Sequence, residues 1–429
     1  MYRRIASRLK ASAALGFALA LGGLLVPSAS ASPTQPRIVS EIPARTTPHA
    51  VDDAVVSNAA VMTFSQSGNV MYAGGLFHKV QNPALTGTYL RQNLFSFSIA
   101  TGTPTGWAPH VNGTVLKTLV YGGYLYVGGS FTVIDGVPSR LVRYSLATLK
   151  VDTAWKAAGI NGSVSDLDVV SGRLLVSGSF TRRLLSLSLY SGANLGYFTA
   201  NPISGTVAAN AGLTSVYRFA VNPSHTRMLA IGNFTTVGKY SRTRAVMFDL
   251  GTTATVDPWY YLPLRKMCGR VTMPEYLRDV DFSPDGSYFV VASTGRTSLP
   301  GDLGHTLCDA AARFETSIPN PAKPTWINYT GGDTLLSIAA VGPAVYVGGH
   351  QRWLNNPYGV DSCGTGCVPR EGVGAIDPVS GKALAWNPGK TRGFGTSVIY
   401  PTPTGIWWGS DGRLFHGAVH DSIAFTPLS

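Results

Sequence analysis

One short segment recurs along the chain and limits what the chain can fold into. Its clearest copy, residues 121–132, reads YGGYLYVGGSFT and places a glycine pair between two runs of alternating apolar and small residues. Alternation with a period of two is typical of a half-buried strand, and the glycine pair favours a tight hairpin turn. Seven copies recur at intervals of 49 to 60 residues. They are anchored on Gly75, Gly129, Gly178, Gly232, Ala292, Gly349 and Gly409.

The residues after each anchor also recur, so the repeat is a complete folding unit. A turn, a further strand and a tryptophan follow the anchor, as in residues 135–155. Each unit is interpreted as four antiparallel strands, A to D, with A before the glycine hairpin and D carrying the tryptophan. A four-stranded unit of this length is typical of a β-propeller blade. The sequence therefore predicts an all-β chain, with residues 51–429 forming a single seven-bladed β-propeller of four-stranded antiparallel blades and strand A innermost.

The two ends of the propeller are predicted less directly. Residues 32–50 are rich in proline and threonine and indicate an extended lead-in segment. Residues 51–64 are expected to hold strand A of blade one, and residues 412–415 and 422–425 to supply strands C and D of blade seven. The ring must close, because an open first or last blade would leave a bare edge. Blade seven is expected to meet blade one, with residues 36–40 as a possible added strand.

The first 31 residues have the pattern of a secretory signal peptide. Arg3, Arg4, Arg8 and Lys10 precede a continuous apolar run over residues 11–26, and small residues end at Ala31. This order of charge, apolar run and small residues is what a signal peptidase recognises. A retained membrane anchor is the weaker alternative because the run is short for a bilayer. We therefore expect a secreted, extracellular product that is not membrane-bound after cleavage.

Composition narrows the possible partners. Charged residues are only 13% of the chain and the formal net charge is +12. No basic cluster with interleaved aromatics is found, so nucleic-acid binding is not expected. The positive charge could favour an anionic glycan or a cell-wall polymer, but no run of lysine or arginine appears, so a solvated surface is the preferred explanation. No phosphate loop or calcium loop is present, so we expect no cofactor and no metal. The protein is expected to be a monomer.

Four cysteines in an exported chain favour disulfides. In an antiparallel blade the B–C loops and the D–A loops emerge on the same face, called here the B–C/D–A face. Cys268 and Cys308 fall in such loops of blade five, and Cys363 and Cys367 in the B–C loop of blade six. Three pairings are possible, and Cys268–Cys308 with Cys363–Cys367 is favoured. A zinc site with His305 or His350 is an alternative that matches no familiar spacing.

Departures from the repeat concentrate on the same face. Where other blades have a Ser-Phe-Thr or Asn-Phe-Thr segment, blade six has His350, Arg352 and Trp353. Five of the eight tryptophans hold the strand D position, whereas Trp353 falls in a loop. It could stack a sugar ring beside a guanidinium and an imidazole, or it could cap the blade while Arg352 ties the loop down. The complete candidate ligand-binding set is Glu275, Arg278, Asp279, Asp333, His350, Arg352, Trp353 and Arg392.

Several motifs resemble a known group of proteins. They are the strand over residues 126–132, the Asp-Gly-Val-Pro turn at residues 135–138, the Asn-Gly pairs at residues 112–113 and 161–162, and residues 349–357. Together they are similar to the secreted β-propeller repeats of actinobacteria, which are largely of unknown function. The resemblance implies a fold and a compartment, and it supplies no catalytic residues.

Two functions therefore remain open. One is a binding propeller that recognises a cell-wall or extracellular glycan on the B–C/D–A face. The alternative is a polysaccharide-degrading enzyme, a glycoside hydrolase or lyase, that uses the same face. Hydrolysis would need two carboxylates, which Glu275 with Asp279 or Asp333 could supply. Acidic residues in such loops more often fix the loops by salt bridges, so the sequence favours binding.

Overall fold

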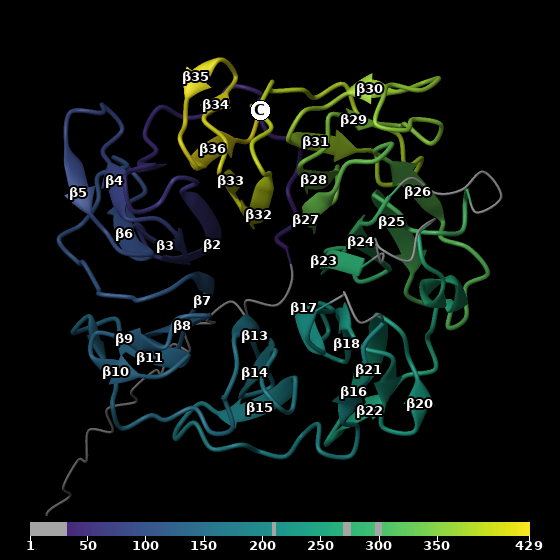
Figure 1. Ribbon diagram of the computed structural model, residues 1–429, viewed down its shortest axis with the longest axis horizontal. Coiled ribbons are helices and arrows are strands. Elements are labelled where there is room, and N and C mark those ends of the chain that lie inside the picture. The colour runs from purple at the N-terminus through teal and green to yellow at the C-terminus, as the bar shows by residue number, and fades with distance from the viewer. Residues whose placement is uncertain (1–31, 208–211, 269–275, 297–302) are drawn as a thin grey trace, which may run out of the picture.

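The structure, a computed structural model, describes residues 32–207, 212–268, 276–296 and 303–429. Seven antiparallel sheets, one for each blade, are arranged in a ring, and smaller ladders flank them (Figure 1). The predicted all-β, seven-bladed propeller is confirmed. The predicted signal peptide lies outside the described residues. Strand A of each blade is innermost and contacts the A strands of its neighbours, including the last with the first. These inner strands are β2 (Ala60–Ser67), β7 (Val115–Tyr121), β13 (Val164–Val170), β17 (Ser215–Val221), β23 (Tyr276–Phe282), β27 (Leu335–Ala340) and β32 (Thr396–Thr402).

Each inner strand pairs with a second strand and, through it, with a third. The second strands are β3 (Val70–Leu76), β8 (Tyr124–Gly129), β14 (Arg173–Gly178), β18 (Arg227–Asn233), β24 (Tyr288–Thr294), β28 (Val345–Gly349) and β33 (Gly405–Ser410). The third strands are β6 (Leu94–Ser98), β11 (Leu141–Ser145), β15 (Leu184–Ser188), β21 (Ala245–Leu250), β25 (Ala310–Glu315), β31 (Val373–Ile376) and β36 (Ile423–Pro427).

The fourth, outer strand varies most among the blades. It is regular in blades two, four and five, as β12 (Lys150–Val151), β22 (Ala254–Val256) and β26 (Trp326–Tyr329). In blades one, three and six it is reduced to one bridge, such as that between Phe97 and Pro104. A single 3₁₀ helix, η2 (Leu262–Arg265), lies between blades four and five within the described residues. The outer edge of the ring is therefore the least regular part of each blade.

A β-bulge at the same place in every inner strand explains the repeated glycine. In blade two the register shifts between Val115 and Lys117, and Gly129 pairs with Val115. A Cβ on Gly129 would lie 2.2 Å from the Thr114 carbonyl oxygen, so a side chain there requires the inner strand to move. The bulge brings the two backbones together and re-aims the next side chain.

The bulge also corrects the alignment of two repeats. In blade five the residue opposite the bulge is Ser293, and in blade seven it is Ser410. The anchors Ala292 and Gly409 are therefore one residue out of register with the other five. Ser293 is accommodated because its hydroxyl lies within donating distance of the Leu307 and Ala310 carbonyls and accepts from the Ala310 amide, contacts that a glycine could not make.

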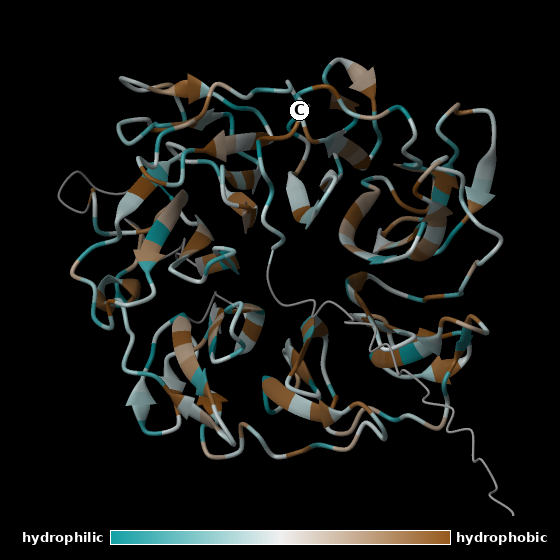
Figure 2. Ribbon diagram, turned by 180° about the vertical axis from the view of Figure 1, so that it is seen from behind, coloured by the Kyte–Doolittle hydropathy of each residue, from teal (hydrophilic) through white to brown (hydrophobic). Residues whose placement is uncertain are grey.

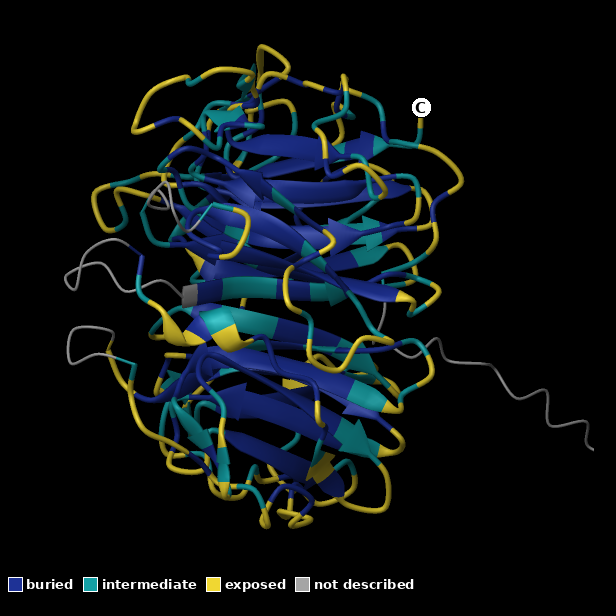
Figure 3. Cartoon of the chain, turned by 90° about the vertical axis from the view of Figure 1, so that its right-hand side faces the viewer, coloured by how far each residue is buried: buried dark blue, intermediate teal, exposed yellow. Residues whose placement is uncertain are grey.

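The hydrophobic core lies between neighbouring blades. Hydrophobic residues concentrate in the sheets rather than the loops (Figure 2), and the sheets are buried while the loops at both faces are exposed (Figure 3). The strand D tryptophans carry this packing across blade boundaries. Trp155 of blade two is 4% exposed and donates its indole N–H to the Ser188 carbonyl of blade three at 3.1 Å. Trp107 and Trp326 make equivalent indole hydrogen bonds to the next blade, whereas Trp259 and Trp386 contribute packing alone among the described residues.

The lead-in segment, residues 32–50, closes the ring. Val39 forms an antiparallel bridge with Leu428, and the Ser40 and Ala44 amides donate to the Pro427 and Phe425 carbonyls, each at 2.7 Å. The segment thus takes the place of the fourth strand of blade seven. The expectation that residues 412–415 and 422–425 are strands C and D is wrong, because β36 is the third strand and Leu414–Phe415 pairs in a separate hairpin. Hydrogen bonds between the two ends of the chain satisfy the edge that would otherwise be bare.

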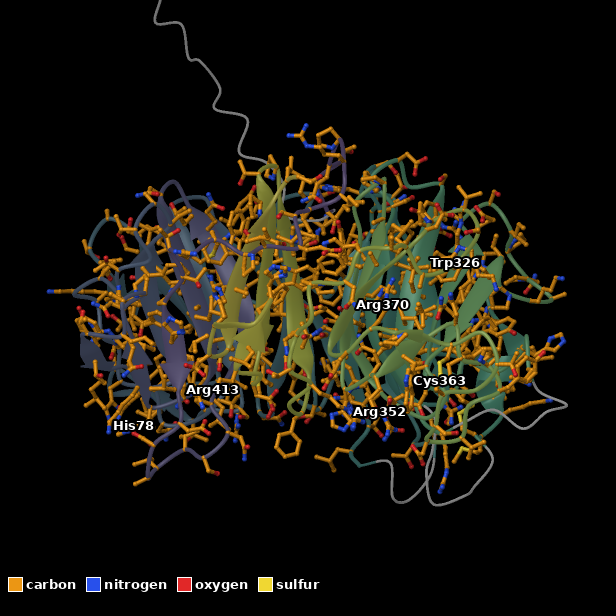
Figure 4. All side chains as sticks on the ribbon, turned by 90° about the horizontal axis from the view of Figure 1, so that it is seen from above. His78, Trp326, Arg352, Cys363, Arg370 and Arg413 are labelled. Carbon is orange, nitrogen blue, oxygen red and sulfur yellow. A yellow bond between two sulfur atoms is a disulfide. The ribbon has the colours of Figure 1, made fainter. Side chains whose placement is uncertain are left out.

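The B–C connections of five blades fold back as small ladders on the B–C/D–A face. The prediction that strand A of blade one spans residues 51–64 is wrong at its start. Strand A begins at Ala60, and β1, which ends at Val51, pairs with β4 in one of these ladders. Figure 4 shows His78, Arg352, Cys363 and Arg413, from three different B–C connections, toward the same side of the ring. The ladder strands are β1 (His49–Val51), β4 (Lys79–Gln81), β5 (Thr88–Leu90), β9 (Val133–Ile134), β10 (Val137–Pro138), β16 (Ile203–Ser204), β19 (Thr236–Val237), β20 (Tyr240–Ser241), β29 (Trp353–Leu354), β30 (Val368–Pro369), β34 (Leu414–Phe415) and β35 (Ala418–Val419).

Two disulfides join loops of this face. Cys268 is bonded to Cys308, which links the connection before blade five to the B–C connection of that blade. Cys363 is bonded to Cys367 within the B–C connection of blade six. The structure thus contains the favoured pairing, and no cysteine is left free.

Candidate functional site

A buried carboxylate organises the B–C/D–A face between blades six and seven. Asp333 is 3% exposed and lies just before β27. Its Oδ2 accepts from Nε of Arg352 at 2.9 Å and from the Arg352 backbone amide at 3.0 Å. Its Oδ1 accepts from Nη2 of Arg352 at 3.0 Å and from Nη2 of Arg392 at 2.6 Å. A planar guanidinium held by both carboxylate oxygens is fixed in position as well as in charge. Asp333, Arg352 and Arg392, together with His350 and Trp353, are called here the Asp333 cluster.

The remaining contacts tie blade six to the loop that precedes blade seven. His350 Nδ1 lies 2.8 Å from the Gly393 carbonyl oxygen, to which it can donate a hydrogen bond. Nε of Arg392 donates to the His350 carbonyl. Next to Gly393 stands Phe394, whose side chain is 70% exposed. An exposed aromatic ring thus lies beside the cluster. The sequence analysis missed it, because a single phenylalanine in a loop does not indicate a binding site.

Trp353 supplies the aromatic surface of the cluster. The Arg352 guanidinium carbon lies 4.2 Å from the centre of its indole ring, which covers one face of the ring. Trp353 is half-buried and opens β29, which pairs with β30. The equivalent ladders of blades two, four and seven begin with Val133, Thr236 and Leu414. Trp353 therefore holds a repeat position with an unusual residue, rather than a position outside the repeat.

Arg278 and Asp279 are not part of the Asp333 cluster. Both lie within β23, not in the loop before blade five, and Arg278 is the bulged residue of that strand. Oδ2 of Asp279 accepts from the Ile338 amide of blade six at 2.9 Å. Thr63 and Asp166 hold the same position after the bulge in blades one and three, and each accepts from an amide of the following blade. Asp279 therefore makes the same kind of hydrogen bond between blades as Thr63 and Asp166 do. Glu275 lies outside the described residues.

A second buried carboxylate near the cluster was not anticipated. Asp309 follows Cys308, is 1% exposed, and neither carboxylate oxygen makes a hydrogen bond to a described residue. The Gly295 amide and the Thr294 hydroxyl lie near this carboxylate and act to lower its pKa. Burial, and then the charge of Asp333, raise the pKa of Asp309 to about 7. No sequence pattern marks this residue, because its character depends on burial alone.

Gln351, between His350 and Arg352, is a second residue of this region that no sequence pattern marks. It occupies the position of Phe77, Phe131 and Phe180 in other blades, and like them it is fully buried. Both polar atoms of its amide lack a hydrogen-bond partner among the described residues. A polar side chain has replaced an aromatic one in the core of blade six, directly beneath the cluster.

Two hollows open elsewhere on the same face. One, of about 250 Å³, lies between blades one and two and is lined by residues that include Phe77, His78, His110 and Val111. In it, His78 Nδ1 lies 2.6 Å from Oδ2 of Asp53, and this hydrogen bond lowers the pKa of Asp53. The other, of about 280 Å³, is lined by Arg182, Phe198 and neighbours. Neither hollow contains a residue of the predicted ligand-binding set.

Within the part of the chain that the structure describes, no group of three histidine, cysteine, aspartate or glutamate residues could hold a metal ion. No helix among those residues is long and apolar enough to cross a membrane.

Comparisons with known proteins bear on the fold. No family model and no curated protein matches the chain. The crystal structure of the RRP9 WD40 repeats is similar, with a TM-score of 0.53 at 10% identity, over 90% of this chain and 99% of that one. A computationally designed protein, Ika8, aligns at 10% identity over 86% of this chain and 97% of its own, with a TM-score of 0.46 that is too low to argue from. At this identity the likeness supports a β-propeller and nothing more specific.

Proposed function

We propose that the protein is a secreted binding propeller that recognises an extracellular or cell-wall glycan on the B–C/D–A face, over blades six and seven. The observation that carries this proposal is the fixed pair of Arg352 and Trp353. Asp333 holds the guanidinium through both of its oxygens, and the guanidinium in turn covers one face of the indole. The part of the half-buried indole that remains open to solvent is the surface on which a sugar ring would stack.

Exposure and charge support this location. The side chains of Arg352 and Arg392 are 31% and 25% exposed, so each retains N–H groups that a hydroxyl or carboxylate can approach. Phe394 and Tyr358 are 70% and 69% exposed and add aromatic surface on the same face. A rigid aromatic flanked by fixed donors requires little ordering on binding, which favours affinity.

Hydrolysis is the second candidate, and one observation favours it. Burial and the nearby charge of Asp333 raise the pKa of Asp309, and a carboxyl with a raised pKa is what a glycosidase uses as its general acid. Both carboxyls are nearly inaccessible, at 1% and 3% exposure. A glycosidic oxygen could not reach them without movement of the loops, so binding is the better supported function.

Secretion is part of the proposal. Two disulfides are typical of proteins from oxidising compartments, and the first 31 residues have the pattern of a signal peptide. Membership of the secreted actinobacterial propeller repeats is proposed on the motifs at residues 126–140 and 349–357.

The test is a screen of the purified protein against wall polysaccharides, read both for retention and for new reducing ends. Retention without new reducing ends is the expected result. New reducing ends that disappear in Asp309→Asn would establish the hydrolase instead. Failure of every anionic and neutral polysaccharide to retain the protein would refute glycan binding.

A further inference from the structure

The inner strand of blade five carries two aspartates, neither of which forms an ion pair with a described residue, although the charge of Arg218 opposes the rise in the pKa of Asp279. Asp279 and Asp281 stand two residues apart on β23 and therefore point to the same side of the strand. Their carboxylates accept from the Ile338 and Ala340 amides of the next blade at 2.9 and 2.8 Å. No ion pair joins Asp281 to a described residue. Burial among the inner strands raises its pKa to about 7, although its side chain is not completely shielded from solvent.

The lead-in segment begins at this pair. The Ser32 hydroxyl donates to Oδ2 of Asp281 at 2.7 Å. Three bonds separate that hydroxyl oxygen from the Ser32 backbone nitrogen, so the nitrogen lies within about 6 Å of the carboxylate. Three residues further on, the Gln35 amide donates to the Val341 carbonyl and its side chain to Thr402, and the segment then closes blade seven. Ser32 is thus the inner end of the segment that closes the ring.

We propose that Asp281, with Asp279 beside it, is a binding site for the α-ammonium group of Ser32 that is created when the signal peptide is removed. The inference rests on cleavage after Ala31, as the sequence predicts, and is independent of glycan binding. Hydrolysis of the Ala31–Ser32 peptide bond by a signal peptidase adds water across it. Ala31 leaves with a carboxylate, and Ser32 keeps an amino group that is protonated near neutral pH.

Cleavage therefore changes a neutral amide into a cation at the place where a buried carboxylate lacks one. An opposite charge within about 4 to 6 Å favours the ionised carboxylate and strengthens the contact. Because Ser32 is continuous with the segment that pairs with β36, the new ion pair holds the closing strand in place. Removal of the signal peptide and closure of the ring are coupled through this site.

The experiment compares the mature protein with the same protein acetylated selectively at its α-amino group, after mass spectrometry has shown that the chain begins at Ser32. Amide hydrogen exchange is followed in residues 35–44 and, for reference, in blade three. The comparison is repeated in Asp281→Asn, which keeps the side-chain shape, and in Asp168→Asn as a matched control. Asp168 is also a buried inner-strand aspartate with a pKa raised to about 7, on blade three.

Acetylation is expected to speed exchange in residues 35–44 about tenfold in the wild type and in Asp168→Asn, and less than twofold in Asp281→Asn. Within each variant, blade three should exchange at the same rate with and without acetylation. The proposal is overturned if acetylation has the same effect in Asp281→Asn as in the wild type, or no effect in either. It is also overturned if the secreted chain begins at a residue other than Ser32.

Discussion

Replacement of Asp309 by asparagine should stabilise the protein at neutral pH, and by an amount that depends on pH. In the unfolded chain this carboxyl loses its proton near pH 4, whereas burial and Asp333 hold its folded pKa at about 7. The folded protein therefore binds more protons between these values. The stability that this carboxyl contributes is fully present below about pH 4 and is lost as the pH rises through about 7.

A shift of about three pKa units corresponds to roughly 4 kcal/mol at pH 8. The asparagine amide avoids this charge, but its N–H₂ group also lacks a partner in the pocket, which costs about 1 to 3 kcal/mol. The charge effect is the larger, so Asp309→Asn should be more stable than the wild type by about 2 kcal/mol at pH 8. Below pH 4 the advantage should vanish or reverse.

Urea unfolding at pH 4, 6 and 8, followed by tryptophan fluorescence, measures the difference directly. The free-energy difference between variant and wild type should grow in favour of the variant with each rise in pH. Asp333→Asn is not a suitable control because it removes a paired charge. Asp377→Asn serves as a contrast of opposite sign: hydrogen bonds from Ser380 lower the pKa of the Asp377 carboxyl, so this variant should be less stable than the wild type at pH 6 and 8. A variant less stable than the wild type at pH 8 would show that the Asp309 carboxylate is ionised and held by a cation.

Three further predictions follow from the same region. Gln351→Met should raise the free energy of unfolding by about 1 to 3 kcal/mol, because it removes a buried amide without partners; a loss of stability would show that the amide is hydrogen-bonded in solution. Asp333→Ala should lower the free energy of unfolding by about 2 to 3 kcal/mol, since two arginines lose their shared anion while remaining partly exposed; unchanged urea unfolding would contradict the role given to the cluster. Trp353→Ala should weaken glycan binding by about 1 to 3 kcal/mol in calorimetry with little change in Tm, whereas Trp155→Ala should lower Tm; the opposite pattern would make Trp353 a structural cap.

The fold was predictable because it depends on periodicity. Alternating strands and glycine hairpins repeat seven times, and a bulge opposite the glycine enforces the same local geometry in each blade. The register of blades five and seven was not predictable, because Ser293 replaces the glycine through hydrogen bonds to carbonyls that are distant in sequence. Closure by the lead-in segment was left open, because Val39 and Leu428 stand at opposite ends of the chain and no local pattern pairs them.

The candidate site was predictable only in part. Irregular residues on one face pointed to Asp333, His350, Arg352, Trp353 and Arg392, which the structure brings together. Acidic residues that belong to strands could not be separated from those in loops without the register, so Asp279 was misplaced. The unpartnered state of Asp309 and Gln351 arises from burial between blades, which sequence alone does not show.

The most direct test of the proposed binding face is hydroxyl-radical footprinting of the protein with and without a wall polysaccharide that retains it. Protection is expected at Tyr358 and Phe394, which are exposed on the B–C/D–A face, and at the half-buried Trp353. Leu213 and Tyr190, which are 75% and 91% exposed on other blades, should react equally in both samples. Protection confined to the hollow at Phe77 and His78, or to residues of the opposite face, would contradict the account.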